Sequence, residues 1–238
     1  MINLLVADDN IHFATSITNT LLKQNKDLHL IRISTDGKDV LNSLKTEKID
    51  VLLLDLNMPL LDGFEVLNFI KISNLPVSVI AISGDALMIS KTLNTSYVYH
   101  FLIKGGHNFT NRLNQTFYEL ITYIKHKNIK KQLLTELCNL GFNITHSGTS
   151  YLLDAILLIY TSNNEDLSTN LEKNVYPSIA RMYNKSIFNI KSSITKSVNF
   201  MYDYTTTYKN KHSLLFGNTL KPTPKFIIHS IISKLMYK

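Results

Sequence analysis

Five residues in the first half of the chain have the side chains needed to accept a phosphoryl group. Asp8 and Asp9 are adjacent, and Asp55, Ser83 and Lys104 follow. Three carboxylates held together repel one another, and a hard divalent cation relieves this, with Mg2+ the natural candidate. The Lys104 ammonium and the Ser83 hydroxyl could then stabilise charge on a phosphoryl group. These residues predict a Mg2+ site formed by the three carboxylates, in which the ion would bridge Asp55 and an incoming phosphoryl group.

The elements expected to position these residues are the strands of a parallel sheet. Residues 1–128 alternate short apolar runs with amphipathic segments, the pattern of a doubly wound sheet wrapped by helices. Reactive groups in such a sheet gather at the carboxyl ends of the strands, and the five residues follow four of the expected strands. The five strands are expected at residues 3–7, 28–34, 51–54, 77–82 and 97–102, and the first and last helices at 11–25 and 108–127.

A simpler interpretation exists for each acid taken alone. An Asp after a strand is usually the N-cap of a helix, and Asp9 or Asp62 alone would be interpreted in this way. The combination of acids, hydroxyl and ammonium at separated strand ends favours a site.

The second half is expected to be all-helical, because its apolar residues recur at intervals of three and four. A helix over 175–183, a break at Asn184 and Lys185, and a longer helix from the N-cap Ser186 to Tyr202 outline a helix-turn-helix. One face of the longer helix is expected to pack on a core through Ile187, Ile190, Ile194, Val198 and Met201.

Net charge separates the halves. Residues 1–129 carry 12 Lys and Arg against 12 Asp and Glu, whereas residues 130–238 carry 13 against 6, so the net charge of +7 belongs to the second half. A basic domain of this kind favours a polyanionic partner, here double-stranded DNA, although a solvated basic surface is the simpler alternative. The candidate DNA contacts are Arg181, Lys185, Asn189, Lys191, Ser192, Thr195 and Lys196.

No stretch approaches the roughly twenty apolar residues needed to span a bilayer, and the start lacks the pattern of a signal peptide. The sequence therefore predicts a cytoplasmic protein without a membrane partner. Cys138 is the only cysteine, so no internal disulfide can form.

The first 125 residues resemble the bacterial receiver domains. The paired acids, Asp55, Ser83 and Lys104 occur in that family's order, and residues 55–63 (DLNMPLLDG) match its signature closely. The resemblance implies that Asp55 accepts a phosphoryl group from the phosphohistidine of an upstream histidine kinase or phosphotransferase. It implies Mg2+, with Ca2+ or another divalent cation also allowed, on Asp8, Asp9 and Asp55.

The same resemblance implies a switch formed by Ser83 and Phe101, with Lys104 bound to the phosphoryl group. The family usually has Pro directly after the Lys, whereas Gly105 and Gly106 follow it here. We therefore expect a trans peptide bond and a looser loop at this position.

The second half contains a series of short motifs, Leu140-Gly141-Phe142, Tyr151-Leu152, Ala155-Ile156, Tyr176-Pro177, Ile179-Ala180, Tyr183-Asn184, Leu215-Phe216-Gly217, Lys221-Pro222-Thr223 and Phe226-Ile227. In these motifs and their order it resembles the DNA-binding effector domain of the sporulation-initiation master response regulators. This resemblance implies a helical domain that binds DNA as tandem copies when the receiver dimerises, with RNA polymerase as a candidate partner.

One departure concerns base recognition. Where the family has Arg, Glu and Arg, this chain has Asn189, Lys191 and Ser192, which cannot make the same bidentate contacts to guanine. We expect a divergent paralogue, a transcription factor with an altered or relaxed DNA target. The expected domains are a receiver at 1–127, a linker at 128–136 and the effector at 137–238.

The second half could instead be an enzyme or a protein-interaction module. An enzymatic output is disfavoured because the second half shows no clustered acids, and His146, His212 and His229 lack ligand spacing. The chain is therefore not expected to be an enzyme beyond slow hydrolysis of its own phosphoryl group. A protein-interaction module regulated by phosphorylation, with weak or no specific DNA binding, is the alternative function.

Overall fold

The chain forms two compact units, residues 1–124 and 125–238, each with its own hydrophobic core. The structure is a computed structural model, and it describes residues 1–88, 97–162, 170–207 and 221–236. No helix in these ranges is long and apolar enough to cross a bilayer.

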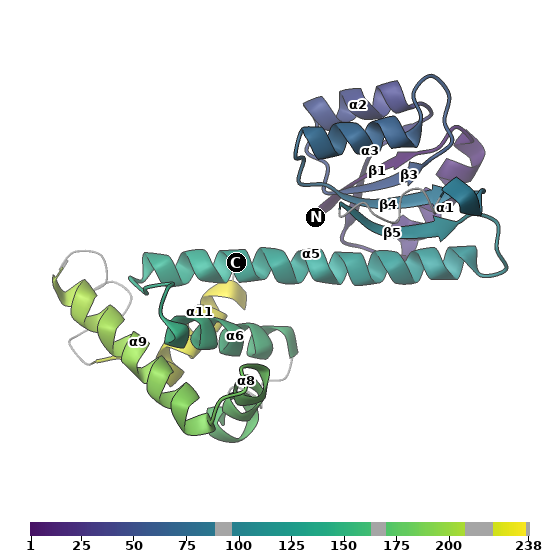
Figure 1. Cartoon of the computed structure of the whole chain (residues 1–238). Coiled ribbons are helices and arrows are strands. Elements are labelled where there is room, and N and C mark those ends of the chain that lie inside the picture. Colours follow the sequence, from purple (N-terminus) through teal and green to yellow (C-terminus); the bar gives the residue numbers. More distant parts are fainter. Residues whose placement is uncertain (89–96, 163–169, 208–220, 237–238) are drawn as a thin grey trace. The chain divides into compact units, whose positions relative to one another are not determined.

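The first unit is built on a five-stranded parallel sheet with the strand order β2-β1-β3-β4-β5 (Figure 1). This confirms the predicted fold, and the predicted strand ends are correct to within one residue. The strands are β1 (Ile2–Ala7), β2 (Leu28–Ser34), β3 (Val51–Asp55), β4 (Ser78–Ser83) and β5 (Val98–Ile103). The helices are α1 (Ile11–Gln24), α2 (Gly37–Thr46), α3 (Gly63–Ile72) and α5 (Phe109–Asn139).

Both faces of the sheet are covered, which explains why its central strands are apolar at almost every position. Leu4 and Val6 of β1 pack with α1 and the first part of α5, whereas Leu5 and Ala7 pack with α2 and α3. Successive side chains of a strand point to opposite faces, so a continuous apolar run serves two cores.

Helix α5 differs from its predicted extent. The basic character of residues 128–136 suggested a solvated linker, but α5 continues through them to Asn139. Leu133 and Leu137, four residues apart, are buried in the core of the second unit, and this apolar stripe accounts for the helix there.

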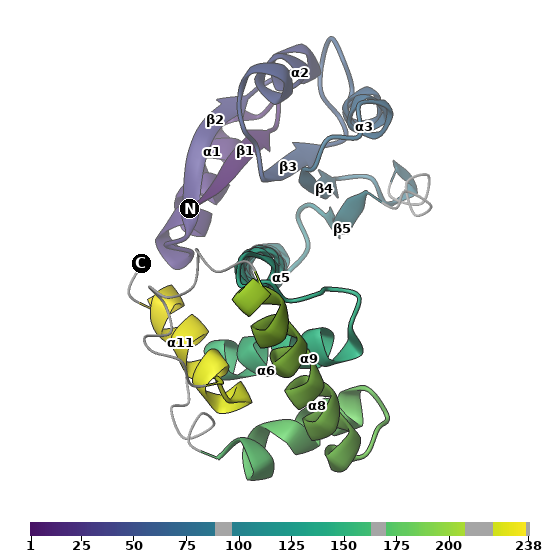
Figure 2. The same cartoon turned by 90° about the vertical axis from the view of Figure 1, so that its left-hand side faces the viewer.

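The second unit contains only helices in its described residues (Figure 2). They are α6 (Ser147–Ser162), a short π-helical segment η1 (Leu171–Val175), α8 (Tyr176–Met182), α9 (Ile187–Thr207) and α11 (Pro224–Met236). Helices α6 and α9 cross closely at Gly148. A Cβ atom at this position would lie 2.0 Å from the Ser193 carbonyl oxygen, so the absence of a side chain permits the approach.

Helices α8 and α9 form the predicted helix-turn-helix. Asn184 makes the turn with a φ of 50°, a left-handed conformation that Asn tolerates. Ser186 Oγ accepts a hydrogen bond from the Asn189 amide at 3.2 Å, as expected of an N-cap. One prediction is wrong: Ile187 is 42% exposed, because the packed face of α9 begins one turn later, at Ile190.

Candidate functional site

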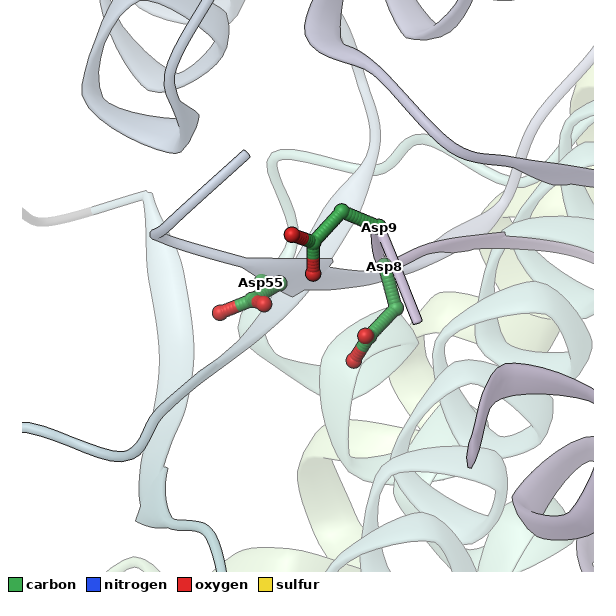
Figure 3. A group of neighbouring side chains, drawn as sticks. All are labelled: Asp8, Asp9 and Asp55. Atoms are coloured by element: carbon green, nitrogen blue, oxygen red, sulfur yellow. The ribbon is translucent and has the colours of Figure 1, made fainter. Parts of the chain in front are cut away.

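Three carboxylates meet at the carboxyl edge of the sheet. Asp8 and Asp9 follow β1, and Asp55 ends β3, which pairs with β1. One oxygen from each lies within 4.8 Å of the others; Asp8 and Asp55 are buried and Asp9 is exposed (Figure 3). The sheet topology alone thus brings together acids separated by nearly fifty positions in the chain.

Backbone amides fix the two buried carboxylates. Asn10 N donates to Asp8 Oδ1 at 3.0 Å, and Asn57 N donates to Asp55 Oδ1 at 3.1 Å. In each residue the other oxygen, Oδ2, lies within ion-pair distance of the Lys104 ammonium.

Lys104 follows β5 and forms ion pairs with both buried acids. Its Nζ lies 2.6 Å from Asp55 Oδ2 and 2.7 Å from Asp8 Oδ2. The same Nζ lies 5.0 Å from the centre of the Phe13 ring, a cation–π contact that sequence reasoning did not identify. Phe13 lies in α1 and packs against the core, and nothing in its sequence spacing distinguishes it from a core residue.

The electrostatics of the cluster suit a bound cation. Burial raises the pKa of the Asp55 carboxyl above its ordinary value, and the charge of Asp8 adds to this, although Lys104 and the Asn57 amide act in the opposite direction. Asp8 Oδ2 is buried and, despite its ion pair, receives no directed hydrogen bond from the described residues. A divalent cation bound by these oxygens would favour the ionised form of Asp55 and would give Asp8 Oδ2 a partner.

The remaining predicted residues of this site lie on β4, which pairs with β3, and on β5, which pairs with β4. Ser83 ends β4 and is fully buried; its Oγ accepts a hydrogen bond from Asp85 N at 3.0 Å, which leaves the hydroxyl hydrogen for an acceptor. Phe101 on β5 is half-buried and packs against the core under α2 and α3.

The backbone conformation at residue 105 is one that glycine adopts and proline cannot. Gly105 has a φ of 78°, a conformation closed to proline, whose ring holds φ near −65°. The described residues contain no cis peptide bond, in agreement with the expected trans bond. The backbone of Lys104 is fixed by a hydrogen bond from its amide to the Ser83 carbonyl oxygen at 2.8 Å.

The loop after Asp55 is shaped by a close backbone approach. A Cβ atom on Gly63 would lie 2.5 Å from the Asp55 carbonyl oxygen, so only glycine fits there. Asp62 is exposed and caps α3 in a reciprocal capping box with Glu65. Asp62 is therefore a helix cap, as its simpler interpretation proposed.

The predicted DNA-contact residues divide by exposure. Arg181, Lys185, Asn189, Thr195 and Lys196 are exposed, whereas Lys191 and Ser192 are half-buried. Lys191 Nζ forms an ion pair with Glu172 of η1 at 2.5 Å, a partner that its sequence position did not reveal.

A polar network around the buried Asp154 supports the helix-turn-helix. The carboxylate of Asp154 in α6 accepts a 2.5 Å hydrogen bond from the Tyr183 hydroxyl and forms a 3.1 Å ion pair with Lys130 of α5. Burial and the bond to Asp154 raise the pKa of the Tyr183 hydroxyl, which therefore stays protonated. The network ties the residue just before the turn to two other helices.

Two family models match consecutive parts of the chain. The model of the response regulator receiver domain matches residues 4–115, and that of the sporulation initiation factor Spo0A C terminal matches residues 133–235. The chain is a response regulator of the Spo0A type. It is accordingly a two-component regulator of transcription, and the suspected family is confirmed.

Solved structures similar to this Spo0A-type regulator cover about half of its chain. A Francisella receiver domain is 26% identical, covers 52% of this chain and 99% of its own, and has a TM-score of 0.45. The receiver domain of AraT from Geobacillus stearothermophilus is 22% identical and covers 53% and 98%, with a TM-score of 0.47. TrrA from Thermotoga maritima, solved with Mg2+ and beryllium fluoride, is 19% identical and covers 50% and 99%, with a TM-score of 0.44.

The effector motifs of this Spo0A-type regulator mostly lie within its helices. Leu152, Ala155 and Ile156 of α6, together with Ile179 and Ala180 of α8, are buried in one core. The motif at 215–217 lies outside the described residues. These motif residues therefore serve packing, whereas Asn189 of α9 is exposed and Lys191 and Ser192 are half-buried.

Proposed function

We propose that Asp55 is the phosphoacceptor of this response regulator, and that its phosphorylation promotes dimerisation and DNA binding by the carboxy-terminal domain. The observation that carries the proposal is the pair of buried carboxylates, Asp8 and Asp55, that share the Lys104 ammonium at 2.7 and 2.6 Å. A buried pair of like charges is costly in a purely structural role, whereas a phosphoryl acceptor site needs it.

The residues proposed for the transfer lie at the carboxyl edge of the sheet. An Asp55 carboxylate oxygen attacks the phosphorus of a phosphohistidine, the P–N bond breaks, and its electron pair remains on the imidazole nitrogen, which then takes a proton. Lys104, already 2.6 Å from Asp55, stabilises charge on the phosphoryl oxygens, and the Ser83 hydroxyl donates to one of them.

Asp8, Asp9 and Asp55 are the residues that would hold Mg2+. When bound, the ion supplies positive charge to the phosphoryl oxygens and offsets the repulsion among the carboxylates. Oxygen-only ligands and the 4.8 Å grouping fit this hard cation, and they also fit Ca2+.

Activation is proposed to reach the surface of the receiver through Ser83 and Phe101. Strand β5, which carries Phe101, also carries the exposed Tyr99, whose ring lies 6.3 Å from that of the exposed Tyr123 in α5. Such an exposed aromatic pair suits a contact between two receivers. Slow hydrolysis of the phosphoryl group and a contact with RNA polymerase belong to the same proposal.

The gene targets are proposed to be sporulation-related, with an altered or relaxed DNA sequence. Exposed Arg181, Lys185 and Lys196 suit phosphate contacts, whereas Asn189 offers an amide at the position where the family has Arg. The half-buried Lys191, paired with Glu172, is less available to bases than its position in the sequence indicated.

The phosphoacceptor is tested by incubating the full chain with phosphoramidate and Mg2+ and following incorporation of acid-labile phosphate. Asp55→Asn should abolish incorporation. Asp62→Asn, a change to an exposed acid in the same loop that keeps the helix cap, should leave it unchanged. Incorporation by Asp55→Asn at the wild-type level would refute the assignment.

A further inference from the structure

The turn of the helix-turn-helix carries large apolar side chains in solvent. Phe188 is 77% exposed, Met182 is 63% exposed and Ile187 is 42% exposed. They lie at the end of α8 and in the first turn of α9. Exposed apolar groups gathered in this way usually mark a binding surface.

Phe188 lies on the same face of α9 as the candidate DNA contacts. Ser192 and Thr195 follow it by four and seven residues, which places them above it along one side of the helix. Lys185 precedes it by three residues, and Arg181 ends the preceding helix; both are exposed. The phenyl ring therefore lies among cations, amides and hydroxyls.

These surroundings identify the kind of partner. Between Lys173 and Lys225 the chain has nine Lys or Arg against the single acid Asp203. An apolar protein surface would bury the exposed cations Arg181, Lys185 and Lys196 without supplying opposite charge, whereas DNA supplies phosphates around the groove. The residues at the amino end of a recognition helix are those that reach base edges.

The apolar group on base edges in the major groove is the C5-methyl of thymine, and Phe is one of the side chains that contact it. We propose that Phe188 packs on a thymine methyl and thereby makes an A·T pair part of the target of this protein. This inference rests on the proposed function, since it requires α9 to enter the major groove. It assigns to the chain a base contact of its own in place of the guanine contacts that Asn189 and Ser192 cannot make.

The test removes the methyl group from the DNA. The full chain with beryllium fluoride and Mg2+ selects a duplex from a randomised pool, and each thymine of that duplex is then replaced by deoxyuridine. Fluorescence anisotropy should show about four-fold weaker binding at one position per half-site, the effect of withdrawing one methyl group from an apolar contact. Phe188→Ala should bind the thymine and deoxyuridine duplexes equally.

Phe200→Ala is the matched control, because Phe200 is a 45% exposed Phe twelve residues along the same helix. This variant should keep the full thymine preference. If Phe188→Ala fails to fold by circular dichroism, a duplex with 5-iodouracil at the sensitive position should photocrosslink to Phe188 of the wild-type chain.

The outcomes distinguish failure of the Phe188–thymine contact from failure of the proposed DNA binding. Salt-sensitive binding that is equal for thymine and deoxyuridine at every position overturns the Phe188 contact and leaves DNA binding intact. A thymine preference that persists in Phe188→Ala also overturns it. Absence of binding to any duplex overturns the proposed function and the inference together.

Discussion

At the scale of single residues, the position of Lys104 depends on more than its two carboxylate partners. The residues after it are Gly105 and Gly106, which give the loop little stiffness, and the Phe13 ring supports the ammonium from α1 at 5.0 Å. We infer that Phe13 keeps Lys104 in place where proline is absent.

Replacement of this ring should slow phosphorylation. Phe13→Leu keeps an apolar side chain but removes the cation–π contact, which is worth roughly 0.5–1 kcal/mol, so we expect a rate about two- to five-fold lower. Incorporation from phosphoramidate at subsaturating concentration measures it. Phe13→Tyr should retain the wild-type rate, and equal rates for Phe13→Leu and the wild type would show that the ring plays no part.

The receiver site was largely predictable at this scale, and the DNA-contact face was less so. Asp8, Asp9, Asp55, Ser83 and Lys104 lie at or just after the ends of β1, β3, β4 and β5, and parallel topology forces such residues to one edge. The partner of Lys191, by contrast, is Glu172, nineteen residues away in a segment with no distinctive pattern. Contacts between side chains of different helices depend on packing angles that spacing alone does not encode.

At the scale of elements, α9 depends on its close crossing with α6. Gly148 lies in the first turn of α6 with its α-carbon against the Ser193 backbone, and an added Cβ would lie 2.0 Å from the Ser193 carbonyl oxygen. Neither the carbonyl nor the helix that carries it can move without opening the shared core of Ile190 and Ile194.

Gly148→Ala should therefore destabilise the second unit in spite of the higher helix propensity of Ala. Overpacking typically costs about 1–3 kcal/mol, which exceeds the roughly 1 kcal/mol gained from propensity. A 2.0 Å approach to backbone places this substitution near the upper end of that range, so the expected net loss is about 2 kcal/mol and would lower the Tm of that unit by several degrees in calorimetry. Ser150→Ala, half-exposed on the same helix, is the control, and a Tm for Gly148→Ala at or above that of the wild type would contradict the crossing.

The elements themselves were well predicted where their hydrophobic pattern was strong. Strands buried on both faces gave unmistakable apolar runs, and the Asn184 turn with its Ser186 cap marked the start of α9 to within a residue. Residues 128–136 were predicted to be a linker, although they are helical in the structure. In the sequence their Lys residues obscured the sparse apolar stripe that includes Leu133 and Leu137. A narrow apolar stripe is a weak signal within a basic segment.

At the scale of the whole molecule, the charge of +7 carried by residues 130–238 should govern affinity for DNA. Each cation that neutralises a phosphate contributes roughly −0.9 to the slope of log K against log salt. Lys185→Ala should therefore reduce that slope by about one and weaken all sequences alike.

The control for this prediction is Lys38→Ala, which removes one exposed cation from the receiver and leaves the total charge equal to that of Lys185→Ala. Its slope should match the wild type in fluorescence-anisotropy titrations over a range of salt. Equal slopes for the two variants would mean that net charge acts at long range and that Lys185 makes no phosphate contact.

The coupling between Asp55 and DNA is tested most directly by one titration. The full chain and its Asp55→Asn variant are titrated against the family's DNA element and a scrambled duplex, each with and without beryllium fluoride and Mg2+. We predict that beryllium fluoride raises the wild-type affinity for DNA about tenfold or more and leaves the affinity of Asp55→Asn unchanged. The wild-type protein should discriminate little between the two duplexes. Wild-type affinity that is the same with and without beryllium fluoride, or absence of binding to either duplex, would contradict a regulator that converts phosphorylation of Asp55 into DNA binding.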